Sequence, residues 1–259
     1  MKQKRPERNS VEKALDVLLA FQEEQPSWGV RELSAHLGFS PATVQRLLQS
    51  LKRYGFVDQN PRTRQYHLGT VYFQFLDTLK NTYPITRAAL PFMRKLSFST
   101  QETVHLNILD GTSRLCIENV ESRSELKASM PIGNRSPLYA GASSKCLLAF
   151  SPPGFIESYL ERAELIPLTE NTITNIARLL NELDRIRKQG YSTSFAERTP
   201  GLGALSAPIQ NHRGELVAAL SLAMPDVRFK NEQHYAFCLK ELVNVAGEFS
   251  RTMGYHKTT

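Results

Sequence analysis

Residues 30–53 read VRELSAHLGFSPATVQRLLQSLKR, and this stretch decides the fold of the first part of the chain. Apolar residues at helical spacing indicate a short helix that ends at Gly38 and a second helix that begins at Pro41. Ser40 can cap the second helix, and a proline in the first helical position loses no hydrogen bond. Two short helices joined by a glycine-containing turn are typical of a helix-turn-helix.

The second helix carries a polar face in its first turns. Thr43, Gln45 and Arg46 lie opposite the apolar residues, and their side chains can hydrogen-bond to base edges and phosphates. A helical hairpin with a solvated face is the common alternative for such a stretch taken alone. The flanking sequence decides between these two interpretations.

Residues 54–68 predict a strand, a basic turn and a second strand, which form a wing with Arg62 and Arg64 at its tip. Residues 10–25 predict an amphipathic helix before the motif, with Ser10 as its cap. The whole pattern predicts a winged helix-turn-helix. We expect its DNA-binding residues to be Ser40, Thr43, Gln45, Arg46, Arg62 and Arg64.

The length and charge of the chain agree with a nucleic-acid-binding domain followed by a second domain. Its 259 residues are enough for two domains, and 41% of them are hydrophobic. Residues 1–68 contain 11 Lys or Arg and 7 Asp or Glu, a net of +4 out of +7 for the whole chain. This basic excess suits a polyanionic partner. The tail, residues 1–9, is either an arm that follows the nucleic-acid backbone or a disordered solubilising end.

Several classes of protein are not indicated. Cys116, Cys146 and Cys238 lie far apart without a Cys-x-x-Cys pair, so we expect buried thiols rather than disulfides or a zinc site. The chain opens without a secretory signal pattern and contains no apolar run of membrane-spanning length. We therefore expect a cytoplasmic protein without a metal, a cofactor or a membrane partner.

The chain after the wing predicts a linker and an α/β domain. Aromatic residues and leucines at helical spacing predict a linker helix at 69–83, whose apolar surface packs against a dimer mate or within the monomer. The domain at 84–259 alternates helices and strands, which suggests an α+β fold with one antiparallel sheet covered by helices. We expect helices at 84–98 (bent or broken at Pro91), 142–150, after Pro152-Pro153, 172–189 and 230–253, and strands at 103–110, 113–120, 125–130, 203–210 and 215–223.

A search for catalytic motifs in the second domain finds little. Ser143-Ser144-Lys145 does not have Ser-x-x-Lys spacing, and His105, His212 and His234 lack an acid or a cysteine at ligand spacing. An enzyme therefore has no support from the sequence. The small residues at 140–144 precede a helix, where backbone N–H groups could bind an anion, although tight helix–sheet packing explains them equally well.

Three segments together resemble one known family. They are SVEKALDVLLAF with the winged helix and RTRQYHLGT (62–70), MPIGNRSPLYAGASSKCLLA (130–149), and IRKQGYSTSFAERTPGLGALSAPIQNHRGELVAALSLA (186–223). The sequence resembles the IclR (isocitrate lyase regulator) family of bacterial transcription factors over nearly its whole length. The resemblance implies a GAF-like effector-binding domain after the winged helix and the linker helix. It also implies dimers through the DNA-binding half and often tetramers through the effector half.

The resemblance also implies an effector pocket. Members that bind small α-keto acids commonly have an acid, a cysteine and a serine where this chain has Ser194, Ala204 and Ala223, whereas Ser221 matches. The pocket should therefore be less polar and roomier at that end, which favours a larger, partly apolar acid and disfavours a metal. The implied effector-binding residues are Ala142, Ser143, Ser194, Leu202, Ala204, Ser221 and Ala223.

These observations favour a transcriptional regulator whose binding to double-stranded operator DNA responds to a small carboxylate effector. The linker helix and the family resemblance suggest a homodimer or a homotetramer. Two alternatives from other classes stay open. One is an enzyme that acts on a small acid and carries a nucleic-acid-binding appendage, and the other is an architectural DNA-binding protein without a ligand.

Overall fold

The computed structural model describes residues 8–22 and 25–256. The chain divides into two compact units, Met1–Tyr83 and Pro84–Thr259. Lys2, Lys4 and Arg5, which the expected basic arm contains, lie outside the described residues. Within the described ranges, no helix has both the length and the apolar composition needed to cross a membrane.

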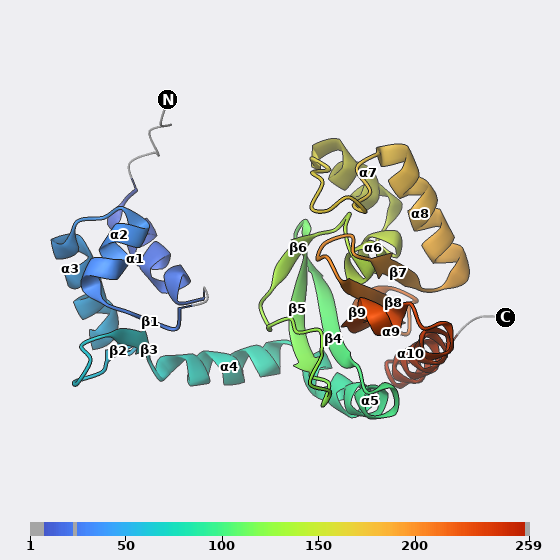
Figure 1. Ribbon diagram of the computed structural model, residues 1–259, viewed down its shortest axis with the longest axis horizontal. Coiled ribbons are helices and arrows are strands. Elements are labelled where there is room, and N and C mark those ends of the chain that lie inside the picture. The colour runs from blue at the N-terminus through green and yellow to red at the C-terminus, as the bar shows by residue number, and fades with distance from the viewer. Residues whose placement is uncertain (1–7, 23–24, 257–259) are drawn as a thin grey trace. The chain divides into compact units, whose positions relative to one another are not determined.

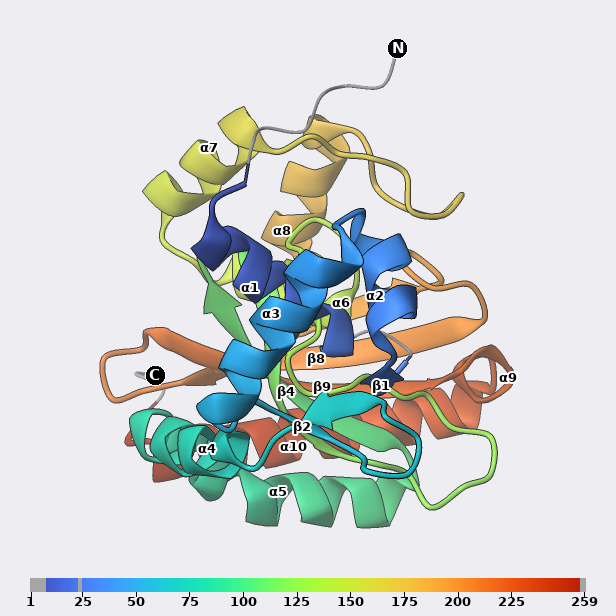
Figure 2. The same cartoon turned by 90° about the vertical axis from the view of Figure 1, so that its left-hand side faces the viewer.

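The first unit is a winged helix. Its helices are α1 (Ser10–Leu19), the 3₁₀ turn η1 (Ala20–Gln22), α2 (Val30–Leu37), α3 (Pro41–Arg53) and α4 (Val71–Thr82). In the described part, β1 (Ser27–Trp28), β3 (Tyr66–Leu68) and β2 (Val57–Gln59) form a small antiparallel sheet in that order, and Figure 2 shows it beside α1, α2 and α3. The core contains buried apolar residues of α1, η1, α2, α3 and the sheet, with Leu33, Val44 and Leu48 fully buried.

The ends of the helices follow local rules, with one correction. Gly38 closes α2 with a left-handed φ of 71°, and Ser40 caps α3, as the sequence predicts. The expected cap of α1 was wrong: Asn9, not Ser10, is the N-cap. Its Oδ1 accepts from Glu12 N at 3.0 Å, and Glu12 Oε2 accepts from Asn9 N at 2.7 Å. This reciprocal pair is a capping box, which Ser10 cannot form with the lysine that stands three residues after it.

One glycine joins the wing to the linker helix. Gly69 N donates to Phe56 O at 2.9 Å. A Cβ atom at Gly69 would lie 2.0 Å from Gly55 O, so no other residue fits there without moving the backbone. The α4 helix that follows has no buried residue, and several of its large apolar side chains are exposed: Phe73, Phe75, Leu76 and Leu79.

The second unit is built on one sheet. In its described part, six antiparallel strands lie in the order β6-β5-β4-β9-β8-β7 (Figure 1). They are β4 (Thr103–Asp110), β5 (Ser113–Val120), β6 (Arg135–Pro137), β7 (Ser192–Phe195), β8 (Leu202–Gln210) and β9 (Leu216–Pro225). The hairpin β4–β5 turns at Gly111 with a φ of 59°, as the Asp-Gly pair predicts. The short edge strand β7 was not expected.

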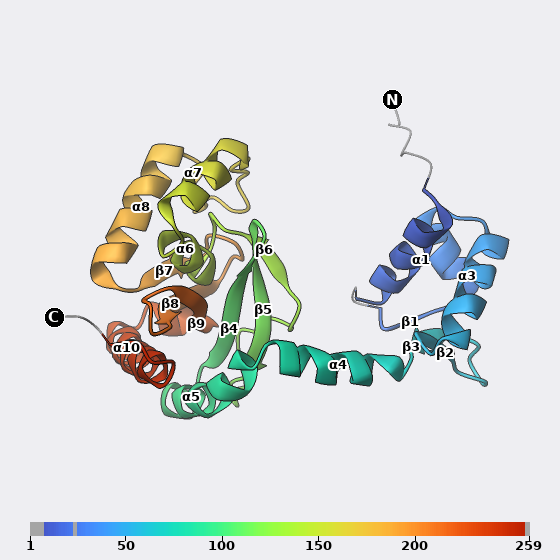
Figure 3. The same ribbon diagram turned by 180° about the vertical axis from the view of Figure 1, so that it is seen from behind.

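Helices cover both faces of this sheet. On one face, α5 (Ile85–Thr100) and α10 (Glu232–Thr252) pack against each other and against β4, β5, β8 and β9. On the other face, α6 (Ala142–Ala149) lies across the strands, and α8 (Ile176–Gln189) packs on α6, as Figure 3 shows from behind. The remaining helices are α7 (Pro153–Arg162) and α9 (Asp226–Phe229). This arrangement confirms the expected sheet with helical cover.

Two expectations for the second unit need correction. The expected helix at 84–98 is present, but it has no break at Pro91: α5 is continuous, and the proline is exposed while Ala89, Met93 and Leu96 stay packed on the sheet. Residues 125–130 form no strand. Side chains satisfy their carbonyls instead: Thr103 Oγ1 donates to Ala128 O at 2.7 Å, and a second such bond reaches Met130 O.

Alternation along the central strands separates two kinds of surface. Val104, Leu106 and Ile108 of β4 join the core against α5 and α10, together with Leu220 of β9. The residues between them, among them His105 and Asn107, are also buried but polar. Because successive side chains of a strand point to opposite faces, these polar groups lie under α6. The cavity of the second unit lies on this polar face.

Candidate functional site

The polar groups of α3 stand at its N-terminal turns. Ser40 Oγ accepts from Thr43 N at 3.2 Å and lies 2.8 Å from Thr43 Oγ1, so these side chains are engaged with each other at the cap. Arg46 is exposed. Gln45 is half-buried, and its Nε2 donates to the hydroxyl of the buried Tyr66 at 3.3 Å. This bond orients Gln45 relative to the wing.

The tip of the wing presents two exposed arginines. Asn60 Oδ1 accepts from the backbone N–H groups of Arg62 at 2.9 Å and Thr63 at 3.2 Å, which closes the turn. Arg64 has a left-handed φ of 61°, and its carbonyl accepts from Gln59 Nε2 at 2.8 Å. The turn is therefore held by its own polar groups, while both guanidinium groups stay in solvent. Exposed cations on a wing beside a polar helix suit a polyanionic surface.

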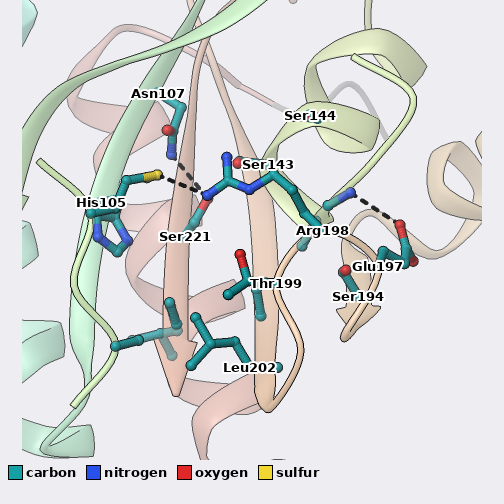
Figure 4. Close-up of a pocket in the computed structure, with 18 of the residues that line it drawn as sticks. His105, Asn107, Ser143, Ser144, Ser194, Glu197, Arg198, Thr199, Leu202 and Ser221 are labelled. Atoms are coloured by element: carbon teal, nitrogen blue, oxygen red, sulfur yellow. Dashed lines mark hydrogen bonds between the residues drawn. The ribbon is translucent and has the colours of Figure 1, made fainter. Parts of the chain in front are cut away.

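The second unit contains a cavity of about 90 Å³. It lies between the polar face of the sheet and the start of α6, and Figure 4 shows it at close range. Part of its wall is apolar, as expected at the end where β8 pairs with β9: Ala204 stands opposite Ala223 in the ladder. The structure brings all seven expected residues together around this cavity: Ala142, Ser143, Ser194, Leu202, Ala204, Ser221 and Ala223.

The N-terminus of α6 already has a carboxylate of the protein beside it. Glu197 Oε2 accepts from Gly141 N at 3.0 Å, and Glu197 Oε1 lies 2.5 Å from Lys145 Nζ. Lys145 is almost fully buried and also pairs with Glu182 at 3.1 Å. A ligand carboxylate placed at this helix end would therefore meet a second negative group, which lowers the attraction expected from the small residues at 140–144.

Two arginines line the cavity without a carboxylate partner. In the part of the chain that the structure describes, neither Arg114 nor Arg198 forms an ion pair. Arg114 is fully buried, and its pKa falls to about 10 because of burial and, secondarily, the nearby Arg198. Burial likewise lowers the pKa of Arg198. Their charges give this end of the cavity a positive potential that the wall does not neutralise.

Neutral groups hold the Arg114 side chain. Its Nε donates to Ser136 Oγ at 2.8 Å, its Nη1 to Asn107 Oδ1 at 3.2 Å and its Nη2 to Asn134 Oδ1 at 3.0 Å. Asn107 in turn donates to Ser221 Oγ at 3.4 Å. A buried network of neutral acceptors thus fixes one guanidinium group beside an expected pocket residue.

His105 is the exceptional member of the lining. It is 2% exposed, and over residues 8–22 and 25–256 its Nε2 is one of two buried side-chain nitrogen or oxygen atoms without a hydrogen-bond partner. Burial first, and then the charges of Arg114 and Arg198, lower the pKa of His105 to about 4. The imidazole is therefore neutral at physiological pH. An unpartnered polar atom in a cavity wall is a place where a ligand group can bind.

The expectation for His234 was wrong. Its Nε2 lies 2.8 Å from Glu102 Oε1 and 3.4 Å from Cys238 Sγ, one helical turn away on α10. Glu102 is fully buried and is also bound by Arg228 through two hydrogen bonds. Glu102 comes from a distant part of the sequence, so spacing could not show it, whereas Cys238 stands only four residues after His234. This cluster connects α9 and α10 to the sheet and lies outside the cavity.

The cysteines agree with the sequence, since Cys116, Cys146 and Cys238 are all buried and free. Burial raises the pKa of each thiol, to about 11 for Cys116 and about 12 for the other two. They are therefore uncharged and are poor nucleophiles. Among the residues described by the structure, no group of three His, Cys, Asp or Glu side chains is placed to hold a metal ion.

The sequence analysis missed the charged and polar half of the cavity. Arg198 stands beside Glu197 in a loop, and Arg114 lies in a hairpin strand where an arginine usually faces solvent. One signal was available in β4, where His105 and Asn107 alternate with apolar residues in a strand that is buried on both faces. Such polar residues need partners and therefore indicate a covered polar site.

Two family models match the chain. The IclR helix-turn-helix domain matches residues 10–61, and the C-terminal domain of the bacterial transcriptional regulator IclR matches residues 78–251. The HTH-type transcriptional regulator KdgR of Escherichia coli (strain K12) is 35% identical over 248 residues, which cover 96% of this chain and 94% of that protein. The HTH-type transcriptional regulator KipR of Bacillus subtilis (strain 168) is 32% identical, with coverage of 95% and 97%.

Solved structures agree with these matches. The IclR protein of Thermotoga maritima superposes with a TM-score of 0.81 at 30% identity, covering 95% of this chain and 99% of that chain. An IclR homologue from Microbacterium hydrocarbonoxydans, solved in complex with 4-hydroxybenzoate, has the same fold with a TM-score of 0.81 at 18% identity. It covers 95% of this chain and 99% of its own.

Proposed function

The chain belongs to the IclR family of bacterial transcriptional regulators, and we propose that a small organic acid, bound in its C-terminal domain, changes its affinity for operator DNA. The observation that carries the proposal is the cavity, which joins seven residues expected at an effector site with two arginines that lack a counterion. The homologue solved with 4-hydroxybenzoate indicates that this fold can hold a carboxylic acid. Because the chain regulates transcription, its place of action would be the cytoplasm.

The winged helix would read the operator through two elements. Thr43, Gln45 and Arg46 of α3 would contact base edges or nearby phosphates in the major groove, with Ser40 at the phosphate backbone. Arg62 and Arg64 would bind phosphates or the minor groove beside the wing. The support is the exposure of Ser40, Arg46, Arg62 and Arg64, together with the turn chemistry that holds the wing tip.

The first experiment tests the effector site with one substitution on each face of β8. Ala204 is partly exposed to the cavity, so Ala204→Leu should fill it, leave operator binding intact and abolish the response to an acid. Ala223→Leu on the paired strand should do the same. Ala207→Leu is the control, because Ala207 is buried in the core under α10 and its enlargement should destabilise the fold by about 1–3 kcal/mol.

The outcome of that experiment also separates the alternative functions. A folded Ala204→Leu protein that still responds normally to the acid would contradict the proposed pocket. Catalytic conversion of the acid without operator binding would favour an enzyme, and operator binding that no acid alters would favour an architectural protein. A transcription factor should show salt-sensitive operator binding that the acid changes, without turnover.

We also propose a homodimer through the first unit, with a tetramer as a further assembly. The exposed apolar residues of α4 leave a surface that a second copy would cover, although the Phe75 ring also contacts Phe56 at 5.9 Å within the monomer. Phe75→Glu should weaken operator binding without unfolding the second unit. Gln74→Glu, which adds the same charge on the same helix, is the control. Tight binding to a palindromic operator by a sedimenting monomer would contradict the proposed dimer surface.

A further inference from the structure

Arg198 makes fewer and weaker hydrogen bonds than Arg114. The contacts recorded for its guanidinium group are Asn134 Oδ1 and Met130 Sδ, both at 3.5 Å. The bond to the amide oxygen is long for a charged donor, whose hydrogen bonds to oxygen are normally below 3 Å, and a thioether sulfur is only a weak acceptor. Arg198 is half-buried, so solvent does not fully replace the missing acceptor. It is therefore the cation of this wall that can still bind an anion directly.

The Met130 sulfur lies between the two arginines. It accepts from Arg114 Nη1 at 3.0 Å as well as from Arg198 Nη2. A thioether is a weak acceptor, and two guanidinium groups that converge on one would be served much better by a carboxylate. The nearby Glu197 cannot serve, because Lys145 and the N-terminus of α6 hold it. The sulfur thus occupies a position between two guanidinium groups, where an anion would be favoured.

The unpartnered Nε2 of His105 supplies a second recognition point. Because this imidazole is neutral, Nε2 donates or accepts according to its tautomer, and a hydroxyl group can bind it in either state. Other side chains of the wall, among them Ser194, Ser221 and Thr199, also carry hydroxyl groups. The polar side of the cavity is therefore suited to ligand hydroxyl groups, in addition to one ligand carboxylate at the arginines.

We propose that the cavity is specific for a hydroxylated carboxylic acid, whose carboxylate takes the place of the Met130 sulfur at Arg198 and Arg114 while a hydroxyl group binds His105 Nε2. The inference rests on the proposed function, since it names the class of acid and the residues that select it. It moves the ligand carboxylate away from the start of α6, where Glu197 already stands. The partly apolar wall at Ala204 and Ala223 would then contact the carbon chain.

Three six-carbon probes separate the two recognition points. D-Gluconate has a carboxylate and hydroxyl groups, hexanoate has the carboxylate alone, and sorbitol has the hydroxyl groups alone. Calorimetric titration of the full-length protein should give the order gluconate, hexanoate, sorbitol from tightest to weakest. Equal or tighter binding of hexanoate would overturn the assignment of hydroxyl recognition. If neither gluconate nor hexanoate binds or stabilises the protein, this result would contradict the proposed function itself.

Variants then assign each recognition point to its residue. Arg198→Leu should weaken the binding of both acids about 10- to 100-fold, as expected for the loss of a charge-assisted hydrogen bond. Arg213→Leu, in an exposed turn, should not change it. His105→Leu should remove the preference for gluconate over hexanoate while hexanoate still binds. Unchanged affinity in Arg198→Leu, alongside a wild-type response to gluconate, would overturn this inference and leave the proposed function standing.

A third variant tests the position of the anion. Met130→Glu would place a carboxylate of the protein between the two guanidinium groups. It should raise the melting temperature of the second unit and make operator affinity insensitive to any acid that alters the wild-type protein. A Met130→Glu protein that binds gluconate as the wild type does would contradict the anion position.

Discussion

The two units use their polar residues in opposite ways. In the first unit, the groups proposed to read DNA are exposed or half-buried on one helix and one turn, above a small apolar core. In the second unit, the groups proposed to bind a ligand are buried on one face of the same sheet whose other face is apolar. DNA is too large to be enclosed, whereas a small acid can be, and the polar groups of an enclosing wall need hydrogen-bond partners from the protein or from the ligand.

This comparison predicts that residues on the apolar face of the sheet stabilise the second unit and do not affect the stability of the first. Leu220 is fully buried there, and Leu220→Ala should cost about 2–5 kcal/mol of its unfolding free energy. The only tryptophan of the chain, Trp28, lies in the core of the first unit, so its fluorescence reports that unit, whereas circular dichroism reports both. The variant should lower the dichroism midpoint in urea and leave the fluorescence midpoint unchanged.

The matched variant Leu48→Ala in α3 should do the reverse, with the larger change in fluorescence. Midpoints that move together in either variant would mean that the two units unfold as one. The two units would then not be independent in stability.

The polar face predicts that the stability of the second unit depends on pH. His105 has a pKa of about 4 in the folded protein and about 6.5 when unfolded, so between these values the unfolded chain binds the extra proton. Stability should therefore be full above pH 6.5 and fall as the pH drops toward 4, by up to about 3 kcal/mol from this group. The measurement is the dichroism midpoint in urea for wild type and His105→Leu across that range.

The difference between the two proteins isolates the histidine, because other titrating groups contribute to both. It should grow steadily as the pH falls below 6.5. A constant difference would place the proton on some other group.

The sequence predicted the first unit well because its signals are local. The glycine that ends α2, the serine that caps α3 and the turn of the wing each depend on residues within a few positions. Even the error at the start of α1 moved the cap by one residue only. The core of the second unit was readable for the same reason, since alternation in β4 and β9 marks a buried face.

The polar half of the cavity was not predicted because it depends on contacts between distant segments. Arg114 meets Asn134, Glu197 meets Lys145, and His105 lies beside both arginines only after the strands have paired. The strand expected at 125–130 failed for a related reason, because side chains from elsewhere bind its carbonyls. The family resemblance indicated seven residues that line the cavity, but it did not indicate Arg114 and Arg198, which give the cavity its charge.

The exposed site of the first unit predicts smaller effects, limited to binding. Gln45→Ala should cost about 1–3 kcal/mol of operator affinity and relax the preference at one base pair. Tyr66→Phe removes only the hydroxyl that orients Gln45, so it should relax the same position less strongly. Sequencing of bound fragments from a random pool gives both results. An unchanged sequence preference in Gln45→Ala would remove this residue from base recognition.

The smallest effect is expected at the wing tip, where charge acts without reading bases. Arg64 has a left-handed backbone, so Arg64→Asn is the suitable change, because asparagine tolerates that conformation and removes only the charge. Affinity should fall by a similar factor for operator and for random DNA, and the salt dependence of binding should flatten by about one ion. Titrations at several salt concentrations measure this slope. If operator affinity falls while random DNA binds as before, Arg64 reads bases, and the exposed site is more specific than its geometry indicates.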